Sequence, residues 1–409
     1  MAISLHRVKT ADDIEVWATA VVRTFHSTAP IEDHIALSQR FHDEGCRSTI
    51  AKIEGAVAGT FRSFDTSMTM PGGGHVDVDA ITGITVQSTH RRRGVLTKMM
   101  RSDLAASVER EQAAAILWSA EYPIYGRFGF GPATRGLGYI IDRSRSALRT
   151  PKVATSDTGS IRFVGADELC NIAPQVFARI RRDRAGEITR NGLQWELESN
   201  LRAWPGREWK GWQVVSTDAQ GAFDGYAQYH VDDHWEHDSP KSTLWVDTVF
   251  ATTPQAHRRL WSFLLGIDLI ATIKAGEIQL DDPLRWMMHD ARGLVAEQMA
   301  DGLWMRPLNP LALLESRSMG DGSVTVSIVD TLGHASGVYR IQAGGVKQLR
   351  RSTADLTLDV GAFGSLVLGG GSAHVLAAAG LIDEHKHGAV ARLHTLLHTA
   401  VPPHCTTHF

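Results

Sequence analysis

The chain has 409 residues, more than one ordinary hydrophobic core accommodates, so two or three domains are expected. Its formal net charge of −3 and hydrophobic content of 43% are typical of a soluble globular protein and argue against nucleic acid as the main partner. No apolar run approaches the roughly 20 residues of a membrane span, so no membrane partner is predicted. Cys46, Cys170 and Cys405 are widely spaced and form no CxxC motif, which indicates reduced thiols in a cytoplasmic protein.

The first segment, residues 1–155, is predicted to mix helices and strands. A strand at Ser4–Val8 precedes a helix at Ile14–Phe25, and Thr10 stands near the expected cap of that helix. A second helix at about Ile31–Phe41 leads into a series of strands that ends at Ile84–Val86.

The stretch from Ile81 to Met100, ITGITVQSTHRRRGVLTKMM, joins a strand to a helix through a basic turn that contains glycine. The first amides of a helix have no partner inside it, and the helix dipole favours negative charge there. Gly94 lets the backbone approach an anion closely. The pattern therefore indicates an anion site, although a solvated helix start has the same local sequence.

Three separate motifs resemble the Eis-type branch of the GNAT N-acetyltransferases. The turn RRRGVL, preceded by Val-x-x-Thr-His, is similar to the pyrophosphate loop of that branch, although Leu96 stands where GNAT loops usually have Gly or Ala. The run IYGRFGFGPAT, which begins at Ile124, resembles the family signature after the fifth strand. The chain also ends in a phenylalanine, Phe409, as Eis-type enzymes do.

This resemblance implies an α+β fold with tandem GNAT domains, the second degenerate, followed by a C-terminal sterol-carrier-like domain. The implied boundaries are 1–155, 156–302 and 303–409. The implied co-substrate is acetyl-CoA, and no metal is predicted. A backbone amide near Val86 would stabilise the oxyanion of the tetrahedral intermediate. The residues implied to bind the cofactor are Ile84, Thr85, Val86, Arg92, Arg93, Gly94, Val95, Leu96, Thr97, Ala120 and Glu121.

The resemblance also implies the catalytic pair. Tyr125 would be the general acid, and the free carboxylate of Phe409 would be the general base, reached by threading the C-terminal tail into the first domain. From the local sequence alone, Tyr125 is as readily a packed aromatic residue, and an ordinary C-terminal tail is disordered.

The middle segment, residues 156–302, resembles a second copy of the first. An apolar strand, Thr243–Phe250, is followed by a Thr-containing link, by His257-Arg258-Arg259 and by a helix. Trp261 is expected to fall where Gly94 stands in the first copy and to fill the phosphate space, which predicts a cofactor-free unit. The run that contains His230, His234 and His237 has the residue types of a zinc site, but its Asp-Asp and Asp-Ser-Pro sequences favour the tip of a hairpin.

The last segment, residues 303–409, alternates short strands and helices and resembles the sterol-carrier-like domain of the family. Its strands are expected at Ser323–Val329, Gly337–Ile341 and Asp355–Val360, and a last helix at Glu384–Thr399. Its histidines are spread around that helix rather than grouped as metal ligands.

The predicted function is acetyl transfer to amines of polyamine-like substrates, such as aminoglycosides or lysine side chains, in a cytoplasmic homohexamer. The alternative is a carrier of apolar ligands with a vestigial transferase domain. A carboxylate before the last residue would have strengthened a cation-binding interpretation, but His408 stands there. The aromatic and acidic candidates for a substrate pocket are Trp17, Phe25, Glu32, Asp33, Trp195 and Trp204.

Overall fold

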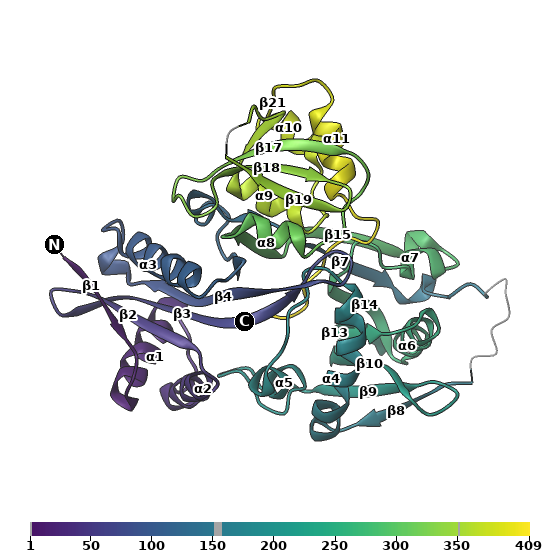
Figure 1. Cartoon of the computed structure of the whole chain (residues 1–409). Helices are drawn as coiled ribbons and strands as arrows, with labels where there is room; N and C mark the ends of the chain where they lie inside the picture. The colour runs from purple at the N-terminus through teal and green to yellow at the C-terminus, as the bar shows by residue number, and fades with distance from the viewer. Residues whose placement is uncertain (1, 151–157, 351) are drawn as a thin grey trace.

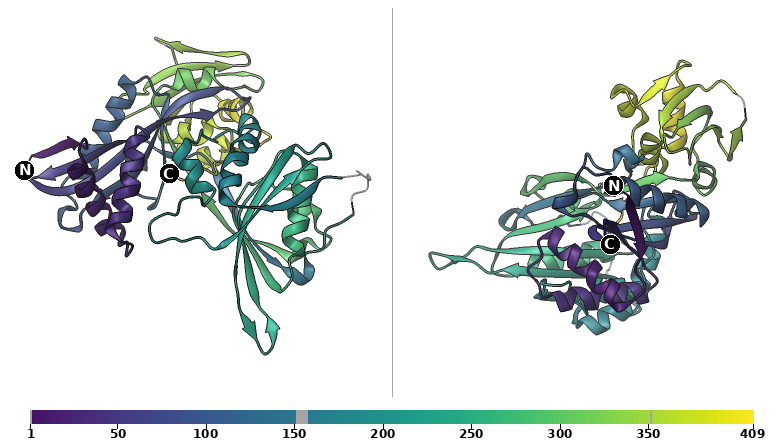
Figure 2. Two further views of the ribbon diagram at one scale, coloured as in Figure 1. Left: turned by 90° about the horizontal axis from the view of Figure 1, so that it is seen from below. Right: turned by 90° about the vertical axis from the view of Figure 1, so that its left-hand side faces the viewer.

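The computed structural model describes residues 2–150, 158–350 and 352–409 and shows three α+β units (Figure 1). Within these residues, hydrogen bonding produces two seven-stranded sheets, one five-stranded sheet and a small two-stranded hairpin. The two larger sheets lie next to one another, and the C-terminal unit lies above both in the view of Figure 1. Figure 2 shows the same three units from two further sides.

The first sheet has the strand order β1-β2-β3-β4-β5-β16-β6, in which β4 and β5 run parallel. Helix α1 packs through Trp17 on one face, whereas α3 packs through Met99 and Met100 on the other. Its elements are β1 (Ile3–Arg7), α1 (Ala11–Phe25), α2 (Ile31–Asp43), β2 (Arg47–Ile53), β3 (Ala56–Thr69), β4 (His75–Val86), α3 (Val95–Glu109), β5 (Ala114–Trp118), β6 (Gly131–Pro132) and β16 (Leu303–Pro307).

The second sheet repeats this plan, with the order β15-β7-β14-β13-β10-β9-β8 and a parallel pair, β13 and β14, at the same place. Helix α6 packs on one face, and α4 packs on the other. Its elements are β7 (Arg135–Asp142), β8 (Ser160–Val164), α4 (Ala166–Asp183), α5 (Gly192–Glu198), β9 (Gly211–Thr217), β10 (Phe223–Asp232), β13 (Ser242–Ala251), α6 (Pro254–Gly266), β14 (Ile270–Ile278), α7 (Leu284–Met287) and β15 (Leu294–Asp301).

The two sheets exchange a strand, so hydrogen bonding does not follow the predicted boundaries. Strand β7 belongs to 1–155 in sequence, but it pairs with β14 and β15 of the second sheet. Strand β16 follows the boundary at 302, but it pairs with β5 and β6 of the first sheet. Each seven-stranded sheet is therefore completed by a strand from a neighbouring segment of the chain.

The C-terminal unit has a five-stranded sheet in the order β19-β18-β17-β20-β21. The last helix begins at Ala389 rather than at the predicted Glu384, because Glu384 ends a strand and Gly388 takes a left-handed conformation (φ 78°) before the helix. No helix of the described residues is long and apolar enough to cross a membrane. The elements are α8 (Pro310–Glu315), β17 (Ser323–Val329), β18 (Gly337–Gln342), β19 (Gly345–Leu349), β20 (Leu356–Asp359), α9 (Val360–Val367), α10 (Ala373–Ala378), β21 (Ile382–Glu384) and α11 (Ala389–Leu397).

A buried carboxyl pair joins α3 to β4. Asp79 on β4 is fully buried, forms ion pairs with Arg47 and Arg110, and accepts a hydrogen bond from a serine of α3. Asp103 on α3 accepts from Ser63 Oγ at 2.9 Å. Burial, together with the nearby charge of Asp79, raises the pKa of Asp103 to about 8. Asp103 is therefore protonated in the folded protein at neutral pH.

We expect Asp103→Asn to remove a pH dependence of stability. Because the folded-state pKa of Asp103 is raised, its stabilising contribution is complete below the unfolded pKa near 4 and is lost as the pH rises to about 8. The variant keeps a neutral side chain, so its melting temperature at pH 8.5 should exceed that of the wild type by several degrees. Each kcal/mol of unfolding free energy corresponds to about 2 to 4 °C. Thermal unfolding between pH 5 and 9 measures this. Asp79→Asn removes the buried partner of Arg47 and Arg110 and leaves them the half-exposed Asp65, so it should destabilise instead. Equal pH slopes for wild type and Asp103→Asn would contradict the assignment.

Candidate active site

The parallel strands β4 and β5 part before β4 ends. Their paired residues run from Val78 and Ala114 to Ile81 and Leu117. Beyond Ile81, β4 continues beside β3 as far as Val86. One edge of the backbone at Ile84, Thr85 and Val86, the predicted cofactor segment, therefore lies outside the pairing with β5.

This segment is held rigidly from the β3 side. Thr60 Oγ1 donates to Gly83 O at 2.9 Å, and Thr60 N donates to Thr85 Oγ1 at 3.1 Å. Gly83 has a φ of 57°, and a Cβ there would lie 2.9 Å from the Trp17 ring. Since only glycine fits this bulge without strain, the local sequence fixes the course of the backbone that follows.

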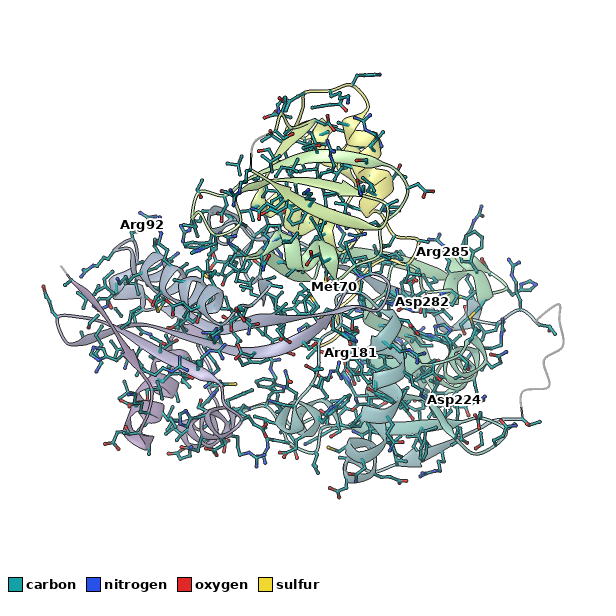
Figure 3. All side chains as sticks on the ribbon, viewed as in Figure 1. Met70, Arg92, Arg181, Asp224, Asp282 and Arg285 are labelled. Carbon is teal, nitrogen blue, oxygen red and sulfur yellow. The ribbon has the colours of Figure 1, made fainter. Side chains whose placement is uncertain are left out.

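The basic turn connects β4 to the N-terminus of α3, and Figure 3 labels Arg92 on its exposed surface. Gly94, the N-cap residue, has a φ of 81°, and α3 has no side-chain cap. A Cβ on Gly94 would meet only Ile3, at 4.0 Å, so the backbone is open to a ligand. Leu96 packs against the core of the first sheet, which explains how the turn accommodates this departure from the usual motif. The residues present therefore fit a pyrophosphate group at the helix N-terminus.

The corresponding turn in the second unit is closed. Thr253 is the N-cap of α6, and its Oγ1 accepts from Ala256 N at 3.1 Å. The prediction that Trp261 replaces Gly94 is wrong, because Trp261 lies about two turns inside α6 and is fully buried in the core. His257 bonds to Asp282 at 2.9 Å, and Figure 3 labels Asp282 well away from Arg92.

Tyr125 lies in the loop that leaves the first sheet after β5. Its side chain is 9% exposed, and its carbonyl accepts from Phe128 N at 2.9 Å, within the short turn η2 (Gly126–Phe128). Burial, reinforced by the charge of Glu121, raises the pKa of the Tyr125 hydroxyl. The hydroxyl is therefore protonated at neutral pH and can donate a proton.

The C-terminal tail is ordered and lies against the first and second units. His404 N donates to Ala185 O at 2.9 Å, and Thr406 N donates to the Glu187 carboxylate at 3.2 Å. The fully buried Thr407 accepts from Arg190 Nε at 2.9 Å. These bonds give the tail an extended course without helix or strand.

The last residues reach the end of β5. Trp118 Nε1 donates to Thr407 O at 3.0 Å, and the His408 ring stacks on Trp118 with ring centres 4.1 Å apart. The Phe409 ring packs edge-on against Phe64 of β3 at 5.5 Å. Figure 1 accordingly shows the C-terminus beside the first sheet.

His408 is held by Glu277, a residue of β14. Their side chains lie 2.6 Å apart. Burial works against a charged imidazole here, but the hydrogen bond to Glu277 outweighs it and raises the pKa of His408. Position 408 itself carries no carboxylate, but Glu277 of β14 places one beside it.

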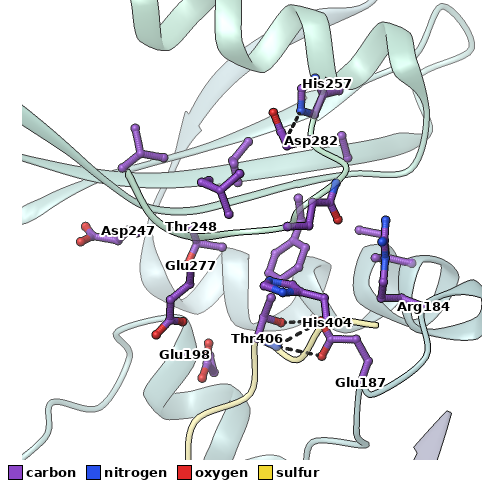
Figure 4. A pocket seen from close by; sticks show the side chains of 18 residues that line it. Arg184, Glu187, Glu198, Asp247, Thr248, His257, Glu277, Asp282, His404 and Thr406 are labelled. Carbon is purple, nitrogen blue, oxygen red and sulfur yellow. Dashed lines mark hydrogen bonds and ion pairs between the residues drawn. The ribbon is translucent and has the colours of Figure 1, made fainter. Parts of the chain in front are cut away.

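An acidic cavity of about 110 Å³ lies where β13 and β14 part, beyond their last pair, Val246 and Ala275 (Figure 4). It occupies the place in the second unit that corresponds to the opening between β4 and β5 in the first. The tail forms one wall through His404 and Thr406. The acidic residues that line this cavity are Glu187, Glu198, Asp247, Glu277 and Asp282.

Acidic side chains outnumber basic ones around this cavity. Arg184 is the one Lys or Arg side chain among its described lining residues. Burial raises the pKa of Glu198 despite its ion pair with Arg190, 3.3 Å away. Glu277 and His404 also line an adjoining cavity of about 250 Å³ that reaches Trp118 at the end of β5. The acidic lining therefore extends toward the C-terminal residues.

The structure brings the predicted catalytic and cofactor-binding residues to the first sheet. It does not bring the predicted substrate-pocket residues to the acidic cavity. Ile84–Val86, the Arg92–Thr97 turn, Ala120, Glu121 and Tyr125 all belong to the first unit, and the tail carries Phe409 to the same sheet. None of the six aromatic and acidic pocket candidates lines the acidic cavity. Trp17, for example, is a core residue with the Arg62 guanidinium 3.9 Å from its ring centre. The site residues that the sequence did not indicate are Trp118, Glu187, Arg190, Glu198 and Glu277.

The histidine run of the second unit forms a hairpin, as expected. Strands β11 (Trp235–Glu236) and β12 (Ser239–Pro240) pair across a turn that contains His237. In the described part of the chain, no group of three or more His, Cys, Asp or Glu side chains is arranged to hold a metal ion.

Comparison with known proteins agrees with this architecture. Residues 6–133 match a family model described as an acetyltransferase (GNAT) domain, residues 186–307 match a second model of that description, and residues 311–406 match a sterol carrier protein domain. An uncharacterised N-acetyltransferase of Streptomyces avermitilis is 36% identical over 97% of this chain and 99% of its own length. N-acetyltransferase Eis of Mycobacterium tuberculosis is 28% identical over 85% of this chain and 84% of its own length.

A solved structure gives the same result for the fold. The crystal structure of Eis1 from Mycobacterium abscessus matches with a TM-score of 0.85 and 28% identity, over 99% of this chain and all of that one. The chain therefore belongs to the Eis-type family of GNAT N-acetyltransferases.

Proposed function

We propose that this enzyme transfers the acetyl group of acetyl-CoA to a primary amine of a cationic substrate, such as a polyamine, an aminoglycoside or a lysine side chain. The acidic cavity carries the proposal, because its carboxylates attract an ammonium group and it adjoins the C-terminal residues at the end of β5. The family resemblance further leads us to propose a cytoplasmic homohexamer.

In the proposed reaction, acetyl-CoA binds with its pyrophosphate at the Arg92–Thr97 turn and its thioester beside Ile84–Val86. The Phe409 carboxylate accepts a proton from the substrate ammonium, through water. The amine nitrogen then forms a bond to the thioester carbon, and an amide near Val86 stabilises the oxyanion. When the C–S bond breaks, the Tyr125 hydroxyl protonates the departing thiolate. The nitrogen of the tetrahedral intermediate gives up its second proton to solvent. The products are the amide, free CoA and this one solvent proton, and the proton on Phe409 returns to Tyr125 through solvent.

Thiol release from acetyl-CoA with a panel of amines tests this function. A polyamine should be acetylated with a lower KM than a short monoamine, since only the former places a second ammonium in the acidic cavity. Asp247→Asn should raise the KM for the polyamine by roughly 10-fold, as for the loss of one charged contact. It should change the monoamine little, because Asp247 bonds to Trp209 and His230 rather than to the C-terminal tail. Arg184→Lys, which keeps the single cation of the cavity, is the matched control. No thiol release with any amine would contradict the proposal.

One further cavity favours the second candidate function, a carrier of apolar ligands. A cavity of about 500 Å³ lies between Tyr122 and Trp304 of the first unit and Ala362, Val375 and Leu376 of the C-terminal unit. A lipid-binding measurement alongside the thiol assay distinguishes the candidates: lipid binding without thiol release would support the carrier.

A further inference from the structure

The loop that carries Tyr125 is docked directly on the C-terminal unit. A Cβ on Gly129 would lie 2.6 Å from Val360, and one on Gly131 would lie 2.0 Å from Gly361 O, both residues of α9. Gly129 also has a φ of 83°. These contacts give a physical reason for both glycines of the FGFG sequence, because each is needed for close approach to α9.

A fully buried ion pair reinforces this junction. Arg306 on β16 is 0% exposed, and its Nη2 donates to both carboxylate oxygens of Asp330, at 2.7 and 2.8 Å. Arg306 Nε donates to Phe128 O at 3.0 Å. Phe128 N is in turn bonded to Tyr125 O. A chain of direct hydrogen bonds thus runs from the C-terminal unit to the backbone of Tyr125.

Asp330 is itself held in one orientation by the loop after β17. Its carboxylate accepts from Leu332 N at 3.0 Å and from Ala335 N at 2.9 Å. Burial disfavours its charged form, but the bonds from Arg306 and Ala335 outweigh burial and lower the pKa of Asp330. The Leu332 side chain packs against the same hydrophobic cluster as Tyr125 and Phe128. The loop therefore meets the Tyr125 segment through both polar and apolar contacts.

We infer that Arg306 and Asp330 form a positioning pair through which the C-terminal unit fixes the place of the Tyr125 hydroxyl. The inference rests on the proposed role of Tyr125 as general acid. A general acid must lie within hydrogen-bond reach of its proton acceptor, so a displacement of the loop by about 1 Å would lower the rate of thiolate protonation. Neither residue touches a reacting atom.

Arg317, which follows α8 in the C-terminal unit, offers a matched control. It is also buried, at 7% exposed, and it also donates to backbone carbonyls, those of Ser318, Val367 and Leu397. These acceptors belong to the C-terminal unit and its connection to β16, not to the Tyr125 loop. The bond to Val367 lies at the opposite end of α9 from Val360 and Gly361, so loss of Arg317 tests the cost of removing a buried arginine away from the contacts of the Tyr125 loop.

The experiment compares Arg306→Lys, Asp330→Asn and Arg317→Lys in the full-length enzyme with two acetyl donors. With acetyl-CoA, Arg306→Lys and Asp330→Asn should lower kcat by roughly 10-fold or more while the KM for acetyl-CoA stays within about twofold. With an acetyl thioester of an arylthiol, whose thiolate leaves without protonation, the same variants should be near wild type. Arg317→Lys should show no dependence on the donor. Thermal unfolding identifies any variant that does not fold, and Asp330→Asn preserves the size of the side chain.

Each outcome decides one question. Equal losses for the Arg306 and Arg317 variants with both donors would reduce the pair to a structural role and overturn the inference. A loss in kcat that the arylthioester rescues would support it. Wild-type enzyme that releases no thiol from acetyl-CoA would instead contradict the proposed function, so failure of the function and failure of the inference are distinguishable.

Discussion

Tyr125→Phe is expected to lower kcat by roughly 10² to 10⁴-fold, the range typical for loss of a general acid. The ring is 9% exposed and packs edge-on against Phe130, so phenylalanine preserves the packing and removes only the hydroxyl. Because burial raises the pKa of Tyr125, the wild-type rate should hold up to and beyond the ordinary tyrosine pKa near 10 before it falls. Steady-state kinetics of thiol release as a function of pH measure both effects.

Tyr122→Phe is the matched control. Tyr122 lies in the same segment but is 63% exposed, with its ring edge-on to Trp304 at 4.8 Å. Loss of its hydroxyl should leave kcat within about twofold of wild type. Comparable rates for the wild type and Tyr125→Phe would assign Tyr125 to packing alone, the other interpretation that its sequence allows.

Extension of the chain by two glycines after Phe409 should reduce kcat about as much as loss of the general acid, by roughly 10² to 10⁴-fold. The extension replaces the α-carboxylate, which is ionised at neutral pH, with a neutral amide, and it moves the new carboxylate away. The tail itself should stay in place, since its anchors at Thr406, Thr407 and His408 precede the change.

Phe409→Leu separates the carboxylate from the ring. This variant keeps the terminal carboxylate and loses the edge-on contact with Phe64, so it should retain most of the activity. The same two glycines placed before Met1 control for the added length. A fully active C-terminal extension would refute the assignment of the base.

Much of the fold follows from the sequence because its signals are local. The Ile81–Met100 stretch predicts a strand, a basic turn and a helix, and the structure has β4, the turn at Gly94 and α3 there. The internal duplication is also visible, and the two sheets repeat the same order around a parallel pair. The exchange of β7 and β16 was not predictable, since pairing between residues far apart in sequence leaves no periodicity in either strand.

Part of the candidate site could likewise be predicted from the sequence, and part could not. The resemblance indicates Tyr125 and Phe409, but the residues that bring the tail to the first sheet come from separate segments. Trp118, Arg190 and Glu277 stand in ordinary strand and loop sequence, and only the folded chain shows that they meet at His408 and Thr407. The expectation for Trp261 was wrong because counting from His-Arg-Arg misaligned the two helices, whose N-caps are Gly94 and Thr253.

The exchange of β7 and β16 has a consequence for how such an enzyme can evolve. After β6 the chain leaves the first sheet and adds β7 to the second sheet. After β15 it returns and adds β16 to the first sheet. Deletion of the second unit would therefore remove the pairing partners of β7 and the connection that leads to β16, so selection on the first unit alone is enough to preserve both.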